Sequence, residues 1–235
     1  MSGPAKNAMP DAVLSRALLE TGGLEVMLCT DAPALTVLSE GERQSSLDAV
    51  LAARPGGDLW LFAYGSLLWN PTVRSVEWRV ARAEGWHRAF CLSIVAGRGS
   101  PERPGLALAL VAGGSCDGLA LRIAECDIEA ELVLLWRREM VTGAYVPRWL
   151  ELLDRDGRRF GTALAFTIDG SSKHYVAGMS AETIVQLLAT GAGSLGSSAE
   201  YLLRTRNALR HYGIPDPMLE DLAKSVSSPS FGRLG

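Results

Sequence analysis

The stretch Leu59-Trp60-Leu61-Phe62-Ala63-Tyr64-Gly65-Ser66-Leu67-Leu68-Trp69-Asn70-Pro71 gives the first strong indication of a fold. Its first six residues form a continuous apolar and aromatic run, without the alternation that is typical of a half-exposed strand. A strand with this pattern is buried on both faces. The run ends at Gly65-Ser66, where the chain can turn. The sequence therefore predicts that residues 59–64 form a central strand and that the main domain begins here.

Downstream of this strand, short strand-like runs are separated by turns rich in Gly and Pro. The strands are expected at residues 76–84, 87–95, 105–111, 118–123, 145–153 and 159–168. A helix is expected over 127–139, between the strands, and two more over 181–189 and 197–212. Because strands come first and βαβ alternation is absent, the pattern predicts an α+β domain with a closed or nearly closed sheet rather than a doubly wound fold.

Residues 1–57 are predicted to form an N-terminal helical extension. A short helix is expected over Pro10 to Glu20, and Ser39 with Glu42 has the S-x-x-E form of a capping box. That box predicts a helix running to about Ala53, which Pro55-Gly56-Gly57 would end. The main domain is expected to cover 58–222, and the Ser- and Gly-rich residues 223–235 are expected to form a mobile tail.

The bulk properties of the chain exclude several classes of partner. A net charge of −3 and a pI near 5.7 give no broad reason to expect nucleic acid or an anionic membrane. No apolar run approaches the roughly 18–20 residues that span a bilayer, and residues 1–10 do not resemble a secretory signal. The four cysteines show no metal-type spacing and the three histidines are scattered, so we expect free thiols, no metal site and a cytoplasmic location.

The junction after the first strand is the first candidate for chemistry. A strand that ends in a Gly-Ser turn leaves successive backbone N–H groups without partners in the sheet. Such groups can converge on an anion, and Gly65 would let the backbone approach it closely. The alternative is a plain strand end, with Asn70-Pro71 making the turn.

Glu139 is the second candidate, because its position is unfavourable for a carboxylate. Ile128, Leu132 and Leu135 follow one face of the predicted helix. At 100° per residue, Glu139 returns to within about 20° of that face. It also lies in the last turn, where the helix dipole opposes negative charge, so burial and dipole would both raise its pKa. The alternative is a helix-end glutamate that reaches solvent or pairs with one of the nearby arginines (Arg137, Arg138 and Arg148).

Other motifs carry weaker signals. Residues 191–196 spell G-x-G-x-x-G, but no strand precedes them and no βαβ unit surrounds them, so a nucleotide site is not expected. Ser66 lacks the G-x-S-x-G context of a nucleophile. Ser197 and Glu200 form another capping box, which would place Tyr201 in the first turn of the last predicted helix. Four tryptophans are expected to supply core volume (Trp78, Trp86, Trp136 and Trp149).

Taken in order, five stretches of the chain resemble the ChaC-type γ-glutamylcyclotransferases. They are Phe62 to Pro71, Gly85 to Leu92, Gly97 to Leu106, Leu135 to Tyr145, and Glu200 to Leu202. The resemblance covers residues 58–222. It implies a small closed or nearly closed mixed β-barrel with flanking helices.

The resemblance also implies roles for individual residues. In that family the Y-G-S-L loop binds the γ-glutamyl moiety, and the Glu of the R-E segment is the catalytic acid/base. By this similarity Glu139 is the expected catalytic group, with no metal and no cofactor. The expected substrate-binding residues are Tyr64, Gly65, Ser66, Leu67, Leu68, Trp69, Tyr145 and Tyr201.

The activity that the resemblance implies is cleavage of glutathione to 5-oxoproline and Cys-Gly by cyclisation of the γ-glutamyl group. Such an intramolecular aminolysis needs an orienting pocket, donors for an oxyanion and one proton shuttle. One alternative is a cyclotransferase for another γ-glutamyl amine or dipeptide. Another is a non-catalytic γ-glutamyl-binding protein on the same fold. The expected partner is a small molecule, and the sequence leaves the oligomeric state open.

Overall fold

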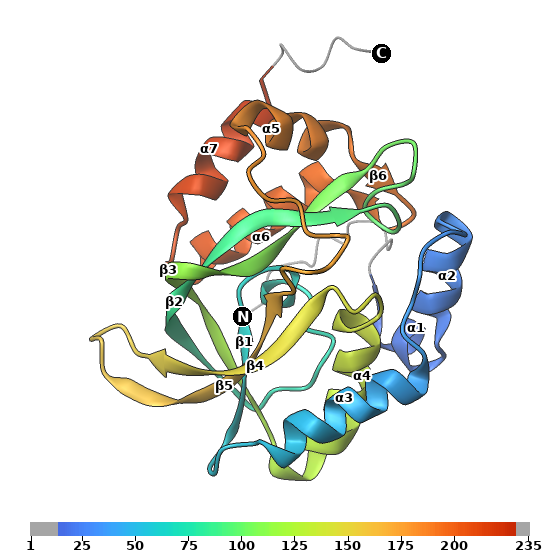
Figure 1. Cartoon of the computed structure of the whole chain (residues 1–235). Coiled ribbons are helices and arrows are strands. Elements are labelled where there is room, and N and C mark those ends of the chain that lie inside the picture. Colours follow the sequence, from blue (N-terminus) through green and yellow to red (C-terminus); the bar gives the residue numbers. More distant parts are fainter. Residues whose placement is uncertain (1–13, 229–235) are drawn as a thin grey trace, which may run out of the picture.

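Five strands close into a barrel in the order β1-β3-β2-β4-β5 in the computed structural model, which describes residues 14–228 (Figure 1). The strands are β1 (Leu59–Ala63), β2 (Glu77–Ile94), β3 (Gly105–Ile123), β4 (Tyr145–Leu153) and β5 (Arg159–Ile168). β1 pairs antiparallel with β3 and parallel with β5, which closes the barrel with mixed strand directions. The predicted α+β class and closed mixed barrel are confirmed.

β1 is the most buried strand of the barrel. All five of its residues are buried, and the side chains of Leu61 and Phe62 are fully inaccessible. The strand has a neighbour on each edge, so its backbone groups are paired on both sides. Burial on both faces follows from its position between the barrel interior and the covering helices, and it confirms the prediction made from the apolar run.

β2 and β3 form one long, bent hairpin, and here the sequence prediction is wrong. Four short strands were expected, separated by turns at the glycines. Instead, the β2–β3 ladder continues past Gly85 on one strand and Gly113 and Gly114 on the other, with a register shift between Glu84 and Trp86. All three glycines have positive φ values, +79°, +100° and +69°. Glycine adopts these angles without strain, so the pair bends at this point without breaking.

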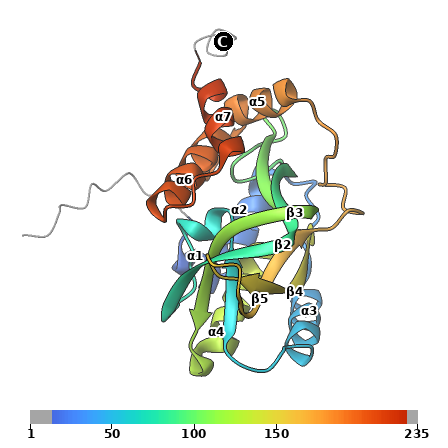
Figure 2. The same cartoon turned by 90° about the vertical axis from the view of Figure 1, so that its left-hand side faces the viewer.

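Seven α-helices surround the barrel within the described residues. They are α1 (Arg16–Glu20), α2 (Gly23–Asp31), α3 (Glu40–Ala52), α4 (Ile128–Glu139), α5 (Ala181–Thr190), α6 (Ser198–His211) and α7 (Pro217–Val226). Short elements complete the fold: 3₁₀ turns η1 (Ser66–Leu68) and η2 (Glu125–Asp127), and strands β6 (Ala192–Gly193) and β7 (Gly196–Ser197). Figure 2 shows α5, α6 and α7 at one end of the barrel and α3 and α4 toward the other. No helix within residues 14–228 is long and apolar enough to cross a bilayer.

The helix boundaries follow the capping signals in most cases. Ser39 and Glu42 form a reciprocal capping box at the start of α3, as predicted. α2 and α7 were not predicted. Asp216 caps α7 and Pro217 occupies its first position, which favours the start of a helix here; the helix ends at Val226. The boundary expected between residues 222 and 223 therefore falls inside a helix, and residues 223–226 are not a tail.

Two terminal predictions lie outside the described part of the chain. They are the start of the helix expected over 10–20 and the end of the tail, 229–235. Among the tryptophans, Trp136 is buried as expected, but the prediction for Trp78 is wrong: it is 55% exposed and contacts only one aromatic neighbour, Tyr212. Trp78 lies at a barrel position that faces outward. The residue type alone does not show whether a tryptophan in a strand faces inward or outward.

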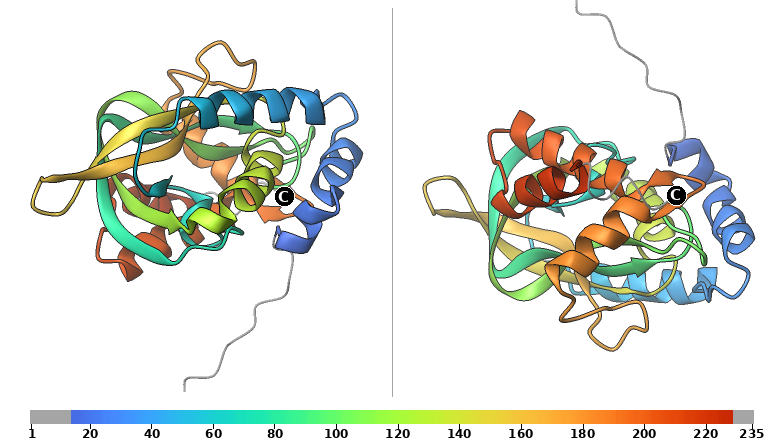
Figure 3. Two further views of the ribbon diagram at one scale, coloured as in Figure 1. Left: turned by 90° about the horizontal axis from the view of Figure 1, so that it is seen from below. Right: turned by 90° about the horizontal axis from the view of Figure 1, so that it is seen from above.

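The N-terminal helices pack against the barrel rather than projecting from it. Figure 3 shows α1 and α2 standing along one side of the molecule in both views. Leu19, Leu24 and Leu28 form a second buried cluster together with Leu134 and Val141, which belong to α4 and the segment after it. α1 and α2 are therefore joined to the main domain by a shared apolar core.

Candidate active site

The loop after β1 presents three backbone N–H groups that donate no hydrogen bond to any described residue. η1 is a single 3₁₀ turn, closed by bonds from Leu68 N–H to Gly65 O (3.0 Å) and from Trp69 N–H to Ser66 O (3.3 Å). The N–H groups of Gly65, Ser66 and Leu67 precede these bonds and have no acceptor in the part of the chain that the structure describes. Free N–H groups at the start of a helical turn are a ready site for an anion or an oxyanion.

Gly65 allows a close approach between this loop and α6. A Cβ atom at position 65 would lie 2.8 Å from Tyr201 Oη, closer than side-chain atoms normally come. Tyr201 Oη also accepts a hydrogen bond from Leu108 N–H at 3.4 Å. A residue larger than glycine at position 65 would therefore displace either the loop or Tyr201.

A small cavity of about 20 Å³ lies beside the three free amides. Its wall brings together most of the residues predicted from the sequence. The lining residues are Tyr64, Gly65, Ser66, Leu67, Leu108, Glu139, Tyr145, Phe166 and Tyr201. A second, more open cavity meets it and shares Ser66, Glu139, Tyr145 and Tyr201. We call the first the inner cavity and the second the outer cavity.

Glu139 ends α4 and directs its carboxylate toward the inner cavity. The helix face predicted to turn inward does so: Ile128, Leu132 and Leu135 are all buried. The Glu139 side chain is 13% exposed, and Oε1 lies 2.9 Å from Arg138 Nε. Within the described residues, Oε1 has no hydrogen bond of good geometry. Burial raises the pKa of Glu139, and the neighbouring Arg138 lowers it only in part.

Arg138 joins Glu139 to the loop after β1. Its guanidinium donates to Ser66 Oγ (2.8 Å), to Thr72 Oγ1 (3.0 Å) and to the carbonyl oxygen of Asn70. The same group pairs with Glu139, so one side chain sets the distance between the carboxylate and the loop. The sequence analysis named Arg138 only as a possible ion-pair partner of Glu139, in the alternative in which Glu139 has no catalytic role. Its second role depends on contacts with residues about 70 positions away, which no local pattern indicates.

Three tyrosine hydroxyls surround the inner cavity. Tyr64 donates to Phe166 O (2.6 Å) and Tyr145 donates to Leu108 O (3.1 Å). Burial raises the pKa of both phenols well above their usual value and raises that of Tyr201 to about 12. All three therefore stay protonated at neutral pH, so the carboxyl of Glu139 is the group in this cavity that can exchange a proton.

Two predicted substrate-binding residues lie outside the inner cavity. Leu68 is buried but faces the opposite side of the loop, toward α6. Trp69 lines the outer cavity, where the guanidinium groups of Arg98 and Arg204 each lie 5.3 Å from its ring centre. The Ser66 hydroxyl accepts a hydrogen bond from Arg138, which does not activate it as a nucleophile.

Arg88 is a further residue that the sequence analysis did not assign. It is 6% exposed, donates to Tyr64 O (2.9 Å) and pairs with Asp216, the N-cap of α7 (3.1 Å). It therefore fixes the carbonyl at which β1 turns into the loop. The available signal was an arginine within the predicted strand 87–95. An arginine that is buried there would be expected to have specific partners, because buried arginines are rarely without them.

The described part of the chain shows neither a metal site nor a dinucleotide site. Residues 14–228 contain no group of three His, Cys, Asp or Glu side chains arranged to hold a metal ion. The glycine-rich stretch 191–196 forms a tight β6–β7 hairpin between α5 and α6. There Leu195 N–H donates to Gly97 O at 2.7 Å, so this stretch packs against the β2–β3 loop.

Comparisons with known proteins agree with this geometry. A family model described as ChaC-like protein matches residues 59–229. The glutathione-specific γ-glutamylcyclotransferase of Escherichia coli (strain K12) is 44% identical over 189 residues, 80% of this chain and 81% of that protein. The human glutathione-specific γ-glutamylcyclotransferase 1 is 29% identical, over 79% of this chain and 86% of its own.

A solved structure supports the fold. The crystal structure of a yeast γ-glutamyl cyclotransferase specific to glutathione matches with a TM-score of 0.68 and 18% identity, over 75% of this chain and 97% of that one. At this identity the match shows the fold alone, a barrel of the kind described above. The family match covers most of the chain and includes the loop after β1, α4 and α6. The chain therefore belongs to the ChaC-like family.

Proposed function

We propose that this protein is an enzyme that cleaves glutathione into 5-oxoproline and Cys-Gly, with Glu139 as the acid/base. One observation carries the proposal: the Glu139 carboxylate, with one buried oxygen free of hydrogen bonds, lies at a cavity lined by three free backbone amides. The named activity of the Escherichia coli and human relatives supports glutathione as the substrate. The four free cysteines support a reducing, cytoplasmic setting.

The reaction is an attack of the substrate on itself. The α-amine nitrogen of the γ-glutamyl group bonds to the γ-carbonyl carbon, and the bond from that carbon to the cysteinyl nitrogen breaks. The attacking nitrogen loses one proton and the leaving nitrogen gains one. Glu139 can take the first proton and return it to the second, so the carboxylate is regenerated in each turnover.

The loop amides can stabilise the negative charge that forms during the reaction. As the ring closes, negative charge develops on the former γ-carbonyl oxygen. The N–H groups of Gly65, Ser66 and Leu67 are donors that no protein acceptor satisfies, so they can bind this oxygen without breaking an existing bond. Binding of the γ-glutamyl chain in a folded form, with amine and carbonyl already in contact, would lower the barrier further.

The electrostatics of Glu139 suit a proton shuttle. A carboxylate with an ordinary pKa is a weak base at neutral pH. Burial raises the pKa of Glu139, which makes the carboxylate a stronger base, and Arg138 offsets part of this rise. Loss of this carboxyl is expected to lower kcat by roughly 10²–10⁴-fold.

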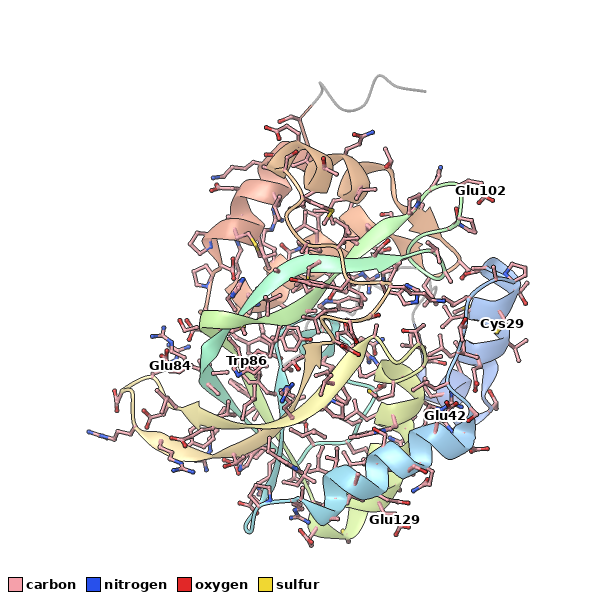
Figure 4. The ribbon with its side chains drawn as sticks, in the orientation of Figure 1. Cys29, Glu42, Glu84, Trp86, Glu102 and Glu129 are labelled. Carbon is pink, nitrogen blue, oxygen red and sulfur yellow. The ribbon has the colours of Figure 1, made fainter. Side chains whose placement is uncertain are left out.

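The test is to incubate the purified protein with glutathione and to follow 5-oxoproline and Cys-Gly by mass spectrometry. We expect turnover by the wild type and a large loss in Glu139→Gln. The matched control is Glu129→Gln, which changes an exposed glutamate in the first turn of the same helix that lines neither cavity; Figure 4 labels its place in the fold. Equal activity in Glu139→Gln and the wild type would remove Glu139 from the mechanism.

A substrate panel separates the remaining alternatives. Glutathione, γ-glutamylcysteine and other γ-glutamyl amines are offered in competition in one assay. Preferential release of 5-oxoproline from glutathione supports the proposal. Preference for another γ-glutamyl compound assigns that substrate instead. A rise in melting temperature with glutathione, but no 5-oxoproline from any compound, identifies a binding protein.

A further inference from the structure

The outer cavity is built partly by the N-terminal helices. Leu24 and Leu28 of α2 and Leu35, which follows that helix, line it from one side. Val141 and Leu195 line it from the main domain. These residues come from three distant parts of the sequence, and they make a mainly apolar wall. The N-terminal helices therefore border the site directly.

One polar group in the outer cavity has no partner. His174, in the segment between β5 and α5, lines the cavity, and its Nε2 is buried without a hydrogen bond inside residues 14–228. The two arginines at this cavity are already engaged, Arg98 with Glu200 (3.1 Å) and Arg138 with Glu139 (2.9 Å). A buried nitrogen without a partner is unfavourable unless a ligand completes it.

The position of the α2 wall is held by specific bonds. Asp31, the last residue of α2, accepts hydrogen bonds from Gly97 N–H (2.9 Å) and from Ser194 Oγ (2.5 Å). Arg43 of α3 forms a two-pronged pair with Glu25 of α2, at 3.0 and 2.9 Å. α2 is thus tied to the loops that form the opposite rim of the cavity.

The two cavities meet where the proposed chemistry takes place. Ser66, Glu139, Tyr145 and Tyr201 line both of them. If the γ-carbonyl oxygen of the substrate reaches the loop amides in the inner cavity, the bond to be cleaved lies at this junction. The rest of the substrate then has to extend into the outer cavity.

We infer that the outer cavity binds the leaving half of the substrate, and that Leu24, Leu28 and His174 determine which leaving halves are accepted. The favoured leaving half is a small peptide with a compact, weakly polar side chain, as in Cys-Gly. That side chain packs on the α2 leucines, and His174 Nε2 hydrogen-bonds to a polar atom of the peptide. This inference rests on the proposed function and gives the N-terminal helices a role in specificity.

The first test uses Leu28→Ala, with Leu19→Ala as its matched control. Leu19 belongs to the same buried cluster but does not line the cavity, so the control reproduces the loss of packing alone. We expect Leu28→Ala to raise KM for glutathione by about tenfold, as is common when a pocket loses an apolar contact, with kcat nearly unchanged. Leu19→Ala is expected to leave KM unchanged in the folded protein.

The second test uses His174→Ala and His174→Gln. The alanine variant is expected to raise KM for glutathione by about tenfold, whereas glutamine retains a donor and restores most of the affinity. His87→Ala is the control, because His87 is exposed on β2 and bonds only to Gly113 O. For both wall variants, the inhibition constant of Cys-Gly should rise with KM, while that of 5-oxoproline should not change.

The outcomes separate this inference from the proposed function. Wild-type release of 5-oxoproline tests the function, and the variants test the outer cavity. An unchanged KM in Leu28→Ala and His174→Ala would overturn the inference while leaving the function in place. So would equal weakening of inhibition by Cys-Gly and by 5-oxoproline.

Discussion

The two ends of α4 each carry a glutamate that is buried or nearly so, and the two carboxylates have opposite surroundings. Glu131, in the first turn, is 2% exposed, pairs with Arg16 (2.6 Å) and accepts a hydrogen bond from Arg74 N–H (2.9 Å). Glu139, the last residue, is 13% exposed, and its Oε1 has no hydrogen bond of good geometry within the described residues. The helix dipole stabilises the first and opposes the second.

This difference shows that burial alone does not identify a functional carboxylate. Glu131 is the more buried of the two, yet its carboxylate is already bound by its partners. The pair with Arg16 ties α1 to the main domain. Glu139 has a single cation beside it and faces a cavity. Unsatisfied bonding capacity next to a cavity is the better indicator. The predictions below test this distinction, beginning with the largest expected effect.

After the loss of Glu139 itself, removal of the cation beside it is expected to have the largest effect. Arg138→Gln releases both Glu139 and the loop that Ser66 begins, so kcat/KM should fall by about 100-fold. Because Arg138 lowers the pKa of Glu139, its loss should also move the acid limb of the pH–rate profile to higher pH. Arg137→Gln is the control, since Arg137 pairs with exposed Glu40 instead. An unchanged profile in Arg138→Gln would contradict the assigned role.

A substitution of Glu131, at the opposite end of α4, should lower the stability of the protein rather than its activity. Glu131→Gln leaves Arg16, which is 27% exposed, with only the exposed Glu20 as its anion, and is expected to cost about 2 kcal/mol. For a chain of this size, that lowers the melting temperature by about 5 °C. Activity per folded molecule should stay close to that of the wild type, as it should in Glu129→Gln. A loss of kcat comparable to that of Glu139→Gln would remove the distinction between the two glutamates.

A substitution in the loop that faces Glu139 is expected to have a smaller effect. Gly65→Ala places a methyl group 2.8 Å from Tyr201 Oη, and we expect kcat/KM to fall by about tenfold as the free amides shift. Gly56→Ala is the control, because nothing lies within 4 Å of the added atom there. Adding Tyr201→Phe removes the oxygen that the methyl group meets, so the double variant should recover part of the loss. Additive losses in the double variant would show that the contact is not the cause.

The parts of the fold that sequence reasoning predicted are those with a local cause. The apolar run of β1, the capping box of α3 and the inward face of α4 each depend on residues within a few positions of one another. Glu139 was found for the same reason, since helix periodicity places it on the buried face. The free amides after β1 follow from the strand ending at Gly65-Ser66.

Features that depend on distant contacts were missed. The bend in β2 and β3 requires the glycines of both strands to lie opposite one another, and a single strand does not reveal this. Arg138 contacts both Glu139 and Ser66, and these two contacts depend on the closed barrel. The contribution of α2 to the outer cavity depends on packing across more than 100 residues, as with Asp31 and Ser194.

The most direct test of the account is the pH dependence of kcat/KM for glutathione. A base must be deprotonated, so the rate should fall as the pH drops through the pKa of Glu139. Because burial raises that pKa, the acid limb should lie above 4.5, the ordinary value for a glutamate side chain. The limb should be absent from the residual activity of Glu139→Gln. A rate that stays constant down to pH 4.5, or a limb that persists in Glu139→Gln, would contradict the claim that Glu139 carries the proton.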